Sequence, residues 1–352
     1  MAPSAFSAGI RVRSRAGRRA LVIAATGLLL LACFLLDILT GPAMLPLNAV
    51  VAALLDPVSG SDDLVAAIIW DIRLPMALMA VVVGCALAVA GVEMQTILDN
   101  PLASPYTLGL SAASGFGAAV SILSGASLFG RPEWAVPFYA FVGALVGCAL
   151  IYAIGRLRGM SSGVMVLAGI AILFLFQSLL SLVQYLASPE TLQEIVFWLF
   201  GSLLKANWET VAITGSVLVL VLPFLARDAW RLTALRLGEE RARALGIEVE
   251  RLRLHVFLAV SLLTASAVCF VGTIGFVGLV APHVARMLVG EDQRFLLPLA
   301  ALCGGVMLSG ASVLSKLVSP GAVVPIGIVT AVAGLPFFFA LILRRGGGAG
   351  WS

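Results

Sequence analysis

Long apolar stretches separated by short polar segments run from residue 21 to residue 343. Stretches such as 208–226, 256–280 and 296–318 are apolar for about the 20 residues that a helix needs to cross a bilayer. Barrel strands would show ten-residue alternation instead. The pattern predicts an all-α integral membrane protein with about ten spans, at 21–39, 65–95, 107–125, 135–155, 163–186, 208–226, 254–273, 276–289, 295–316 and 323–343.

Three of these spans have unusual lengths. The second is overlong and is expected to begin outside the bilayer, whereas the third and the eighth are short. Short or Gly/Pro-broken spans often mark the pathway of a transporter. Gly272, Gly275, Gly278 and Pro282 predict a broken helix between the seventh and eighth spans. The Gly143-x-x-x-Gly147 pattern allows close helix approach and is weak evidence for a contact between two copies.

Composition agrees with a membrane protein. Of the 352 residues, 61% are apolar and only 11% are charged, so a soluble globule could not cover its surface. The pI of about 9.0 does not indicate nucleic-acid binding, because the basic residues lie at span boundaries. A basic run before residues 21–39 also fits a signal peptide, but this stretch is long enough to span and no Ala-x-Ala-like site follows before Asp37. We therefore expect a retained first span.

Charge placement predicts the orientation. With the N-terminus inside, Arg73, Arg131, Lys205 and Lys316 fall at or near the outer face, and the other eighteen of the 22 basic residues fall inside. We expect a cytoplasmic basic tail at 1–20, a single transmembrane domain at 21–343 and a cytoplasmic tail at 344–352. The only substantial cytoplasmic loop is expected at about 227–253.

The sequence offers no recognisable catalytic or metal site. The five cysteines fall within predicted spans and form no Cys-x-x-Cys pair, so they are expected to be packing residues. His255 and His283 are the only histidines, and Gly-x-Ser-x-Gly is absent. Neither of the two lysines, Lys205 and Lys316, belongs to a phosphate-binding Gly-x-x-x-x-Gly-Lys-[Ser/Thr] loop. If transport is driven by ATP, the nucleotide is expected to bind to another polypeptide.

The loop at 227–253 contains a possible partner site. Leu237, Ala244 and Leu245 recur at about the helical period, and Gly238 and Gly246 bracket the stretch as breakers or caps. A short amphipathic helix with an apolar stripe fits this pattern. A solvated loop that carries the positive-inside charge fits it equally well.

Polar residues inside the spans indicate where a pathway could run. Gln177, Ser181 and Gln184 share one face of the fifth span, which should line a protein interior or a watery cavity, with interhelical hydrogen bonding as the alternative. Glu93 lies in a deeply apolar run, where a carboxylate must be paired, protonated or hydrated. It could meet a cationic part of a cargo or pair with an arginine near the inner boundary.

Five blocks in order make the chain resemble the FecCD-type permeases, membrane subunits of ABC importers for iron-siderophores, haem and cobalamin. The resemblance extends from about residue 72 to residue 343. The blocks are Arg73-Leu74-Pro75 through Met94-Gln95 and Asn100-Pro101-Leu102-Ala103 to Leu108-Gly109; Leu167-Ala168-Gly169 with Trp198 and Gly201-Ser202; Leu237-Gly238 to Leu245-Gly246; Gly272 to Pro282-His283-x-x-Arg286; and Pro325-x-Gly327 with Gly334-x-Pro336-Phe337-Phe338.

The resemblance implies ten helices in a type II importer fold, a homodimer around a central pathway, two ATPase subunits below and a binding protein above. It makes residues 237–246 the expected ATPase contact, with Leu237, Gly238, Glu239, Arg243, Ala244, Leu245 and Gly246 as contact residues and His283 and Arg286 in the same region. A helix-end role for the last two is the alternative. Glu93, Gln95, Gln177, Ser181 and Gln184 are the expected pathway residues.

The resemblance also implies that outer-face basic residues meet acidic groups of the binding protein. Arg73 matches such a position, and Lys316 stands where the family commonly has arginine. Met76, Ser312 and Val323 depart from the common Arg, Asp and Glu, which reduces the expected docking charge. The alternative for Arg73 is an interfacial anchor.

Together these features predict a permease without active-site chemistry, in a bacterial cytoplasmic membrane. No cofactor is expected on this chain, with ATP and Mg²⁺ on the ATPase. A ferric siderophore is the first expectation for the cargo, and haem or cobalamin is the alternative. An ion-coupled secondary transporter that uses Glu93 and a membrane-bound sensor or scaffold are competing classes.

Overall fold

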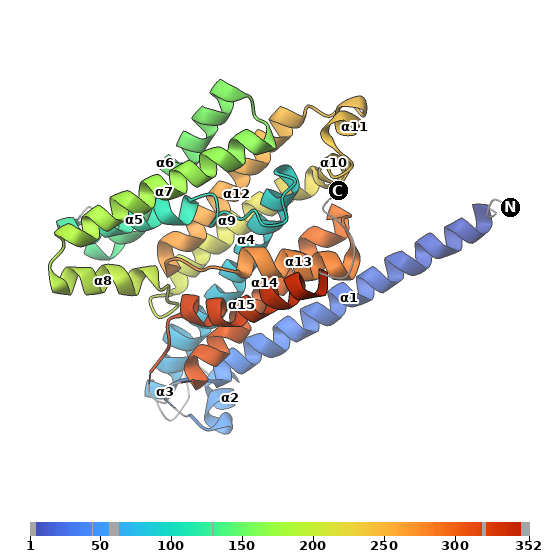
Figure 1. Cartoon of the computed structure of the whole chain (residues 1–352). Helices are drawn as coiled ribbons and strands as arrows, with labels where there is room; N and C mark the ends of the chain where they lie inside the picture. The colour runs from blue at the N-terminus through green and yellow to red at the C-terminus, as the bar shows by residue number, and fades with distance from the viewer. Residues whose placement is uncertain (1–4, 44, 56–62, 129, 319–321, 346–352) are drawn as a thin grey trace.

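The computed structural model describes residues 5–43, 45–55, 63–128, 130–318 and 322–345 (Figure 1). Its regular elements in these ranges are helices, apart from an isolated bridge between Leu128 and Arg131. The distal parts of the two predicted tails, residues 1–4 and 346–352, lie outside the described residues. The predicted tail from residue 5 to residue 20 is helical and continuous with the first span.

A helix occupies each of the ten predicted spans, which confirms the predicted fold class. These helices are α1 (Ala5–Leu39), α4 (Leu74–Ile97), α5 (Leu110–Ser124), α6 (Pro132–Arg158), α7 (Ser162–Leu186), α9 (Trp208–Arg227), α12 (Val249–Val271), α13 (Val277–Val289), α14 (Gln293–Leu317) and α15 (Ile326–Arg345). By length and composition, seven helical segments of the described chain could cross a membrane, and three apolar helices are shorter. Two of the shorter ones, α5 and α13, are the spans that the sequence predicts to be short.

Short helices complete the two ends of the bundle. The overlong second span begins as α3 (Asp63–Ala67) and a π-helical turn, η1 (Ile68–Arg73), before α4. The sequence analysis did not predict α2 (Leu47–Leu55), α8 (Pro189–Leu199) or α10 (Ala229–Leu235). Ser188 caps α8 by accepting from the amide of Thr191 at 3.3 Å, and Pro189 occupies its first turn.

Most spans run between two ends of the molecule (Figure 1). We call the end that carries α10 and α11 (Glu239–Ala244) the α11 end, and the end that carries α2 and α3 the α2 end. Helix α1 extends past the bundle beyond the α11 end, and α15 packs against α14 and α13. Because the loops alternate between these ends, each end collects segments that lie far apart in the sequence.

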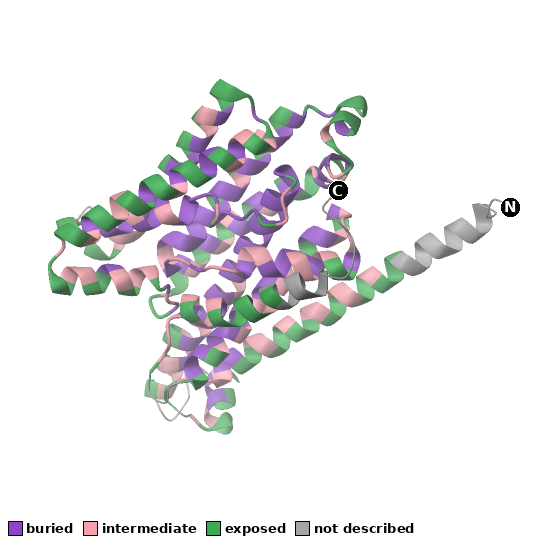
Figure 2. Ribbon diagram, viewed as in Figure 1, coloured by how far each residue is buried: buried purple, intermediate pink, exposed green. Residues whose placement is uncertain are grey.

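Helix α4 lies at the centre of the bundle and is buried along most of its length (Figure 2). It packs most extensively against α14, because glycines let the two backbones touch: a Cβ added at Gly84 would overlap the carbonyl of Gly304. Gly143 and Gly147 pack α6 against Ala113 of α5. In this structure the Gly-x-x-x-Gly pattern therefore serves packing within the chain.

The predicted break between the seventh and eighth spans is confirmed. Helix α12 ends at Val271 and α13 begins at Val277, and the linker holds Phe276 at a positive φ of 66°. The linker is bonded to its neighbours, since Ser202 donates its amide to the carbonyl of Val271 at 2.7 Å. Nonhelical backbone inside a membrane is tolerated where protein surrounds it or where it lines a cavity.

Candidate functional site

Helix α11 presents an apolar stripe at the α11 end. Leu237 and Leu245 are each 58% exposed and Ala244 is exposed, whereas Ala242 is completely buried against the bundle. Gly238 (φ 106°) and Gly246 (φ 80°) bracket the helix, as their conformational freedom predicts. A short helix thus forms inside the predicted stretch 237–246, at Glu239–Ala244, and Leu237 and Leu245 flank it as exposed residues beside Ala244.

A buried arginine fixes α11 to the bundle. The Arg253 side chain is 2% exposed and reaches three separate segments. It donates to the carbonyl of Ile97 at 2.8 Å, to the carbonyl of Met160, and to the carboxylate of Glu239. Glu239 also pairs with Arg243 at 3.2 Å along α11. Through Arg253 of α12, these bonds tie α11 to the end of α4 and to the turn between α6 and α7.

A chain of polar contacts continues from this segment to the broken span. Arg236 pairs with Asp99 and, at 3.2 Å, with Glu291. Glu291 accepts from Arg286 of α13 at 3.0 Å, and Arg286 also donates to Gln95 of α4 at 2.8 Å. Gln95, predicted for the pathway, and Arg286, predicted for the ATPase contact, therefore belong to one network. His283 lies on the same helix, with its ring 6.1 Å from that of Phe337 of α15.

Glu93 lies beside this network, fully buried on α4. Neither of its carboxylate oxygens has a hydrogen-bond partner among the described residues, although Arg286 interacts with it electrostatically. One nitrogen of Arg286, Nη2, is also buried and has no hydrogen-bond partner in the described part of the chain. Both groups therefore keep unsatisfied bonding capacity, which costs free energy in this conformation. Within the described chain Glu93 forms no ion pair with an arginine, and contact with a cargo is not tested, so both alternatives for Glu93 stay predictions.

The linker between α13 and α14 ties α1 into the same end. Asp292 accepts from Arg294 at 2.8 Å and from Arg19 of α1 at 3.4 Å. The hydrogen bond from Arg294, helped by the charge of Arg19, holds the pKa of the Asp292 carboxyl below its usual range. Arg19 also lies 5.0 Å above the ring of Phe295. The N-terminal helix is therefore bonded to the bundle at this end.

The α2 end places Arg73 differently from the expectation. Its side chain is buried, with 4% of the residue exposed, and it donates to the carbonyls of Ile38 and Leu39 at 3.0 Å and to that of Ala43. The carbonyls of Ile38 and Leu39 belong to the last turn of α1, where intrahelical donors are lacking, and the carbonyl of Ala43 also accepts from the amide of Leu45. The expected presentation of Arg73 to a binding protein does not agree with this burial, whereas the alternative of an anchor does.

Lys316 is buried as well, in an ion pair that the sequence analysis missed. Its Nζ lies 2.7 Å from Oδ1 of Asp37, and the side chains are 2% and 0% exposed. Lys316 also donates to the carbonyl of Asp37 at 3.0 Å. The expectation of a docking charge at Lys316 therefore needs correction in the same way, because Asp37 neutralises it. The signal was present in the sequence, since Asp37 is a lone carboxylate inside an apolar span.

The polar face of the fifth span lies at the surface of the chain. On α7, Gln177 and Ser181 are exposed and Gln184 is half-buried, and Ser181 donates to the carbonyl of Gln177 at 3.0 Å. Interhelical hydrogen bonds, the alternative for this face, are not made by Gln177 or Gln184 within the described chain. In a membrane, such a face would have to meet water or another protein.

Four further residues of the network were not singled out from sequence. They lie in boundary segments and are Arg236, Arg253, Glu291 and Asp292. Charged residues are so frequent in these segments that the sequence does not show which of them form pairs. The structure pairs them across up to 273 residues of sequence, in the contact between Arg19 and Asp292. In the described residues, no three or more His, Cys, Asp or Glu side chains are grouped to hold a metal ion.

Comparison with known proteins places this geometry in a family. The chain matches the model of the FecCD transport family over residues 29–344. It is 41% identical to the ABC transporter permease protein MJ0087 of Methanocaldococcus jannaschii, over 86% of this chain and 88% of the relative. It is 38% identical to the hemin transport system permease HmuU of Yersinia pestis (79% and 84% covered) and 35% identical to the Fe(3+)-citrate import permease YfmE of Bacillus subtilis (92% and 95% covered).

A solved structure has the same fold. It is described as an inward-facing conformation of a metal-chelate type ABC transporter, with a TM-score of 0.81 and 31% sequence identity. The match covers 92% of this chain and 99% of the solved chain. The likeness therefore extends over nearly the whole chain.

Proposed function

Because the chain belongs to the FecCD transport family of ABC transporter permeases, we propose that it is the membrane-spanning subunit of an ATP-driven importer. Two copies would enclose the pathway, and two separate ATPase subunits would bind ATP and Mg²⁺. The membrane would be the bacterial cytoplasmic membrane, with the α11 end and both termini in the cytoplasm. The excess of basic residues at that end supports this orientation.

One observation carries the proposal: the exposed helix α11 is bonded, through buried charges, to the elements that would have to move. An ATPase would grip the apolar stripe of Leu237, Ala244 and Leu245. Arg253 would transmit its displacement to α4, and the contacts among Arg236, Glu291 and Arg286 would transmit it to the broken helix α13. Alternating access requires such a rearrangement of one part of the bundle against another.

The pathway is proposed to run along the polar face of α7. Gln177, Ser181 and Gln184 would line it opposite the same face of a second copy, which removes these groups from lipid. The cargo is proposed to be an iron chelate, of which a ferric siderophore is the first candidate. Haem or cobalamin is the alternative, because relatives are named for hemin, vitamin B12 and Fe(3+)-citrate.

A binding protein would deliver the cargo at the α2 end. Arg73 and Lys316 would act there indirectly, by fixing the ends of α1 and α14 that form the docking surface. Direct docking charge would come from exposed residues of that end, such as Lys205 and Arg131. Docking is therefore expected to depend only moderately on ionic strength.

Purification of the tagged protein from its own host in mild detergent, followed by mass spectrometry, tests the proposal. An ATP-binding subunit should be recovered in equal amount. Leu245→Glu should abolish this recovery, because a charge replaces an exposed apolar contact. Leu204→Glu, the same change at a similarly exposed leucine near the opposite end, should not. Repeated recovery of the permease alone would contradict the proposal.

The buried, unpartnered carboxylate of Glu93 favours one second candidate, an ion-coupled secondary transporter. Uptake into vesicles separates the two functions. The importer requires ATP and continues after the ion gradient is collapsed with an ionophore. The secondary transporter requires the gradient, and in Glu93→Gln the gradient should no longer drive uptake.

A further inference from the structure

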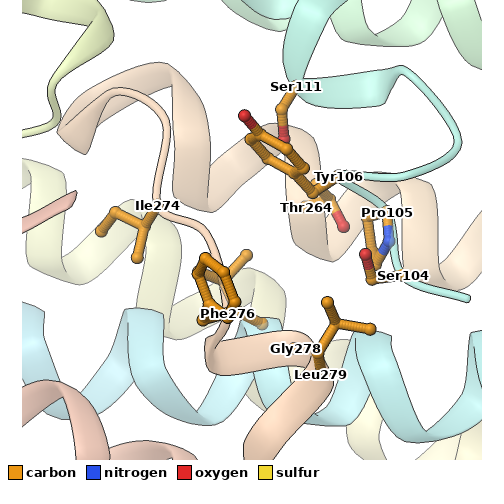
Figure 3. Close-up of a pocket in the computed structure, with 10 residues that line it drawn as sticks. Ser104, Pro105, Tyr106, Ser111, Thr264, Ile274, Phe276, Gly278 and Leu279 are labelled. Carbon is orange, nitrogen blue, oxygen red and sulfur yellow. The ribbon is translucent and has the colours of Figure 1, made fainter. Parts of the chain in front are cut away.

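The two short spans direct their N-terminal ends at one small pocket (Figure 3). Ser111 belongs to the first turn of α5, and Gly278 and Leu279 belong to the first turn of α13. Tyr106, which is 47% exposed, stands where the pocket reaches the surface. At 15 and 13 residues these helices are only about 20 Å long, less than the roughly 30 Å of a hydrocarbon core, so neither is long enough to cross it alone.

One buried residue of the pocket has an unsatisfied hydroxyl. Ser111 is 3% exposed, its side chain points into the pocket, and its hydroxyl has no hydrogen-bond partner in the described chain. Tyr106, whose hydroxyl also has no partner within the described chain, is 47% exposed and can bond water. Of the remaining hydroxyls, Thr264 donates to the carbonyl of Val260 at 2.8 Å, and Ser104 interacts with Thr107. Ser111 is therefore free to donate to a ligand.

The backbone adds donors of the same kind. The amide nitrogens of Ser111, Ala112 and Gly278 make no hydrogen bond within the described part of the chain, as expected in the first turn of a helix. Two helix N-termini also bring partial positive charge to the same place. None of the lining residues carries a charge that would offset it.

The size of the pocket limits what can enter. Its free volume is about 10 Å³, enough for one water molecule or one oxygen atom of a larger ligand. A whole iron chelate does not fit. A ligand whose bulk stays outside, beyond Tyr106, could place a single oxygen between the two helix ends.

We propose that this pocket binds one oxygen of an oxyanion group, of the carboxylate class, on the cargo during its passage. The proposal deepens the proposed function and rests on it for the source of the anion. Ser111 and the first-turn amides of α5 and α13 would hold that oxygen. Opening of the α12–α13 break would separate the two helix ends and release it.

A built-in anion tests the preference of the pocket without any cargo. Ser111→Asp places a carboxylate between the two helix ends and should raise the unfolding midpoint of the purified protein by about 2 °C or more. Ser114→Asp is the matched control, because Ser114 is buried and unpartnered on the same helix but does not line the pocket. It should lower the midpoint. If both variants lower it equally, the anion site is refuted.

Transport by the complete complex in vesicles, with its ATPase and binding protein, tests the source of the anion. The probes are ferric citrate, which is anionic, and an uncharged ferric trihydroxamate. Ser111→Ala should raise the KM for the anionic chelate about 10-fold and leave the uncharged one unchanged, and Ser114→Ala should change neither.

The outcomes separate two failures. Equal effects of Ser111→Ala on both chelates, no effect on either, or transport by the wild type of the uncharged chelate alone would refute the cargo assignment. A wild-type complex that transports neither chelate nor any other iron chelate would contradict the proposed function. In that case the unfolding comparison still decides whether the pocket favours an anion.

Discussion

At the scale of single residues, the pair of Lys316 and Asp37 decides the stability of the α2 end. Lys316→Met would leave the Asp37 carboxylate buried without a partner, and we expect a loss of about 3–5 kcal/mol. The double variant Asp37→Leu/Lys316→Met removes both charges and should recover most of that loss. Thermal unfolding in detergent measures both. If the double variant is no more stable than the single one, the pair has a role beyond mutual neutralisation.

The opposite effect is expected at Glu93, because neither of its carboxylate oxygens accepts a hydrogen bond from a described residue. Glu93→Gln keeps the shape and removes a carboxylate that no described group bonds, so the unfolding midpoint should stay the same or rise. Gln95→Leu is the comparison, since it removes the acceptor that Arg286 uses and should lower the midpoint. A marked loss of stability in Glu93→Gln would show that the carboxylate is already well paired. Unchanged uptake of every cargo in Glu93→Ala would exclude direct contact with the cargo.

At the scale of elements, Arg253 connects the apolar stripe of α11 to the core. Arg253→Lys keeps the charge but cannot reach Ile97, Met160 and Glu239 at once, because an ammonium lacks the forked geometry of a guanidinium. We expect the complex to assemble and hydrolyse ATP while cargo uptake falls several-fold. The ratio of uptake to hydrolysis measures this. Arg251→Lys is the control, since that side chain is exposed and pairs only locally. Equal ratios in the two variants would contradict the connection.

The elements also show what the sequence could predict. Hydrophobic run length located all ten spans, and the short α5 and α13 were recognised because their apolar runs are short. The amphipathic pattern at 237–246 predicted α11 and its exposed face. Helix α8 was not predicted, although Ser188, Pro189 and Glu190 form an N-terminal helix signal. The prediction rested on apolar runs long enough to span a membrane, and α8 has only 11 residues.

Pairing between distant residues was harder to predict. Arg73 and Lys316 were assigned to the surface from their position at a span end, but their partners, the end of α1 and Asp37, lie more than 30 and 270 residues away. Likewise, nothing in the sequence places Gln95 beside Arg286. The chemistry of each residue was visible in the sequence, and its partner depended on the packing of the helices.

At the scale of the whole molecule, a polar face of α7 is not covered by the rest of the described chain. In a membrane, this face of a single copy would meet lipid. Only 28% of the apolar window of α7 is buried within this chain, and Gln177 and Ser181 lie on its open side. Exposed amide and hydroxyl groups are costly in hydrocarbon. Near α7, backbone hydrogen bonds join the end of α8 to the α12–α13 linker and to α15. One of them runs from the amide of Gly327 to the carbonyl of Phe200 at 3.0 Å. A second copy facing α7 would cover this face and enclose water between the two chains.

Cross-linking tests this arrangement directly. Its background is a variant in which Cys33, Cys85, Cys148, Cys269 and Cys303 are replaced, since all five are free thiols. A single cysteine at Gln177 or Ser181 should give a dimer with a bifunctional reagent long enough to span a pathway, and ATP should change the yield as the pathway opens and closes. A cysteine at Val219 of α9, which is 68% exposed but apolar, should face lipid and give little dimer. If Val219 cross-links as well as Gln177, the α7 face is not the one that meets the second copy, and the pathway must be sought along another helix.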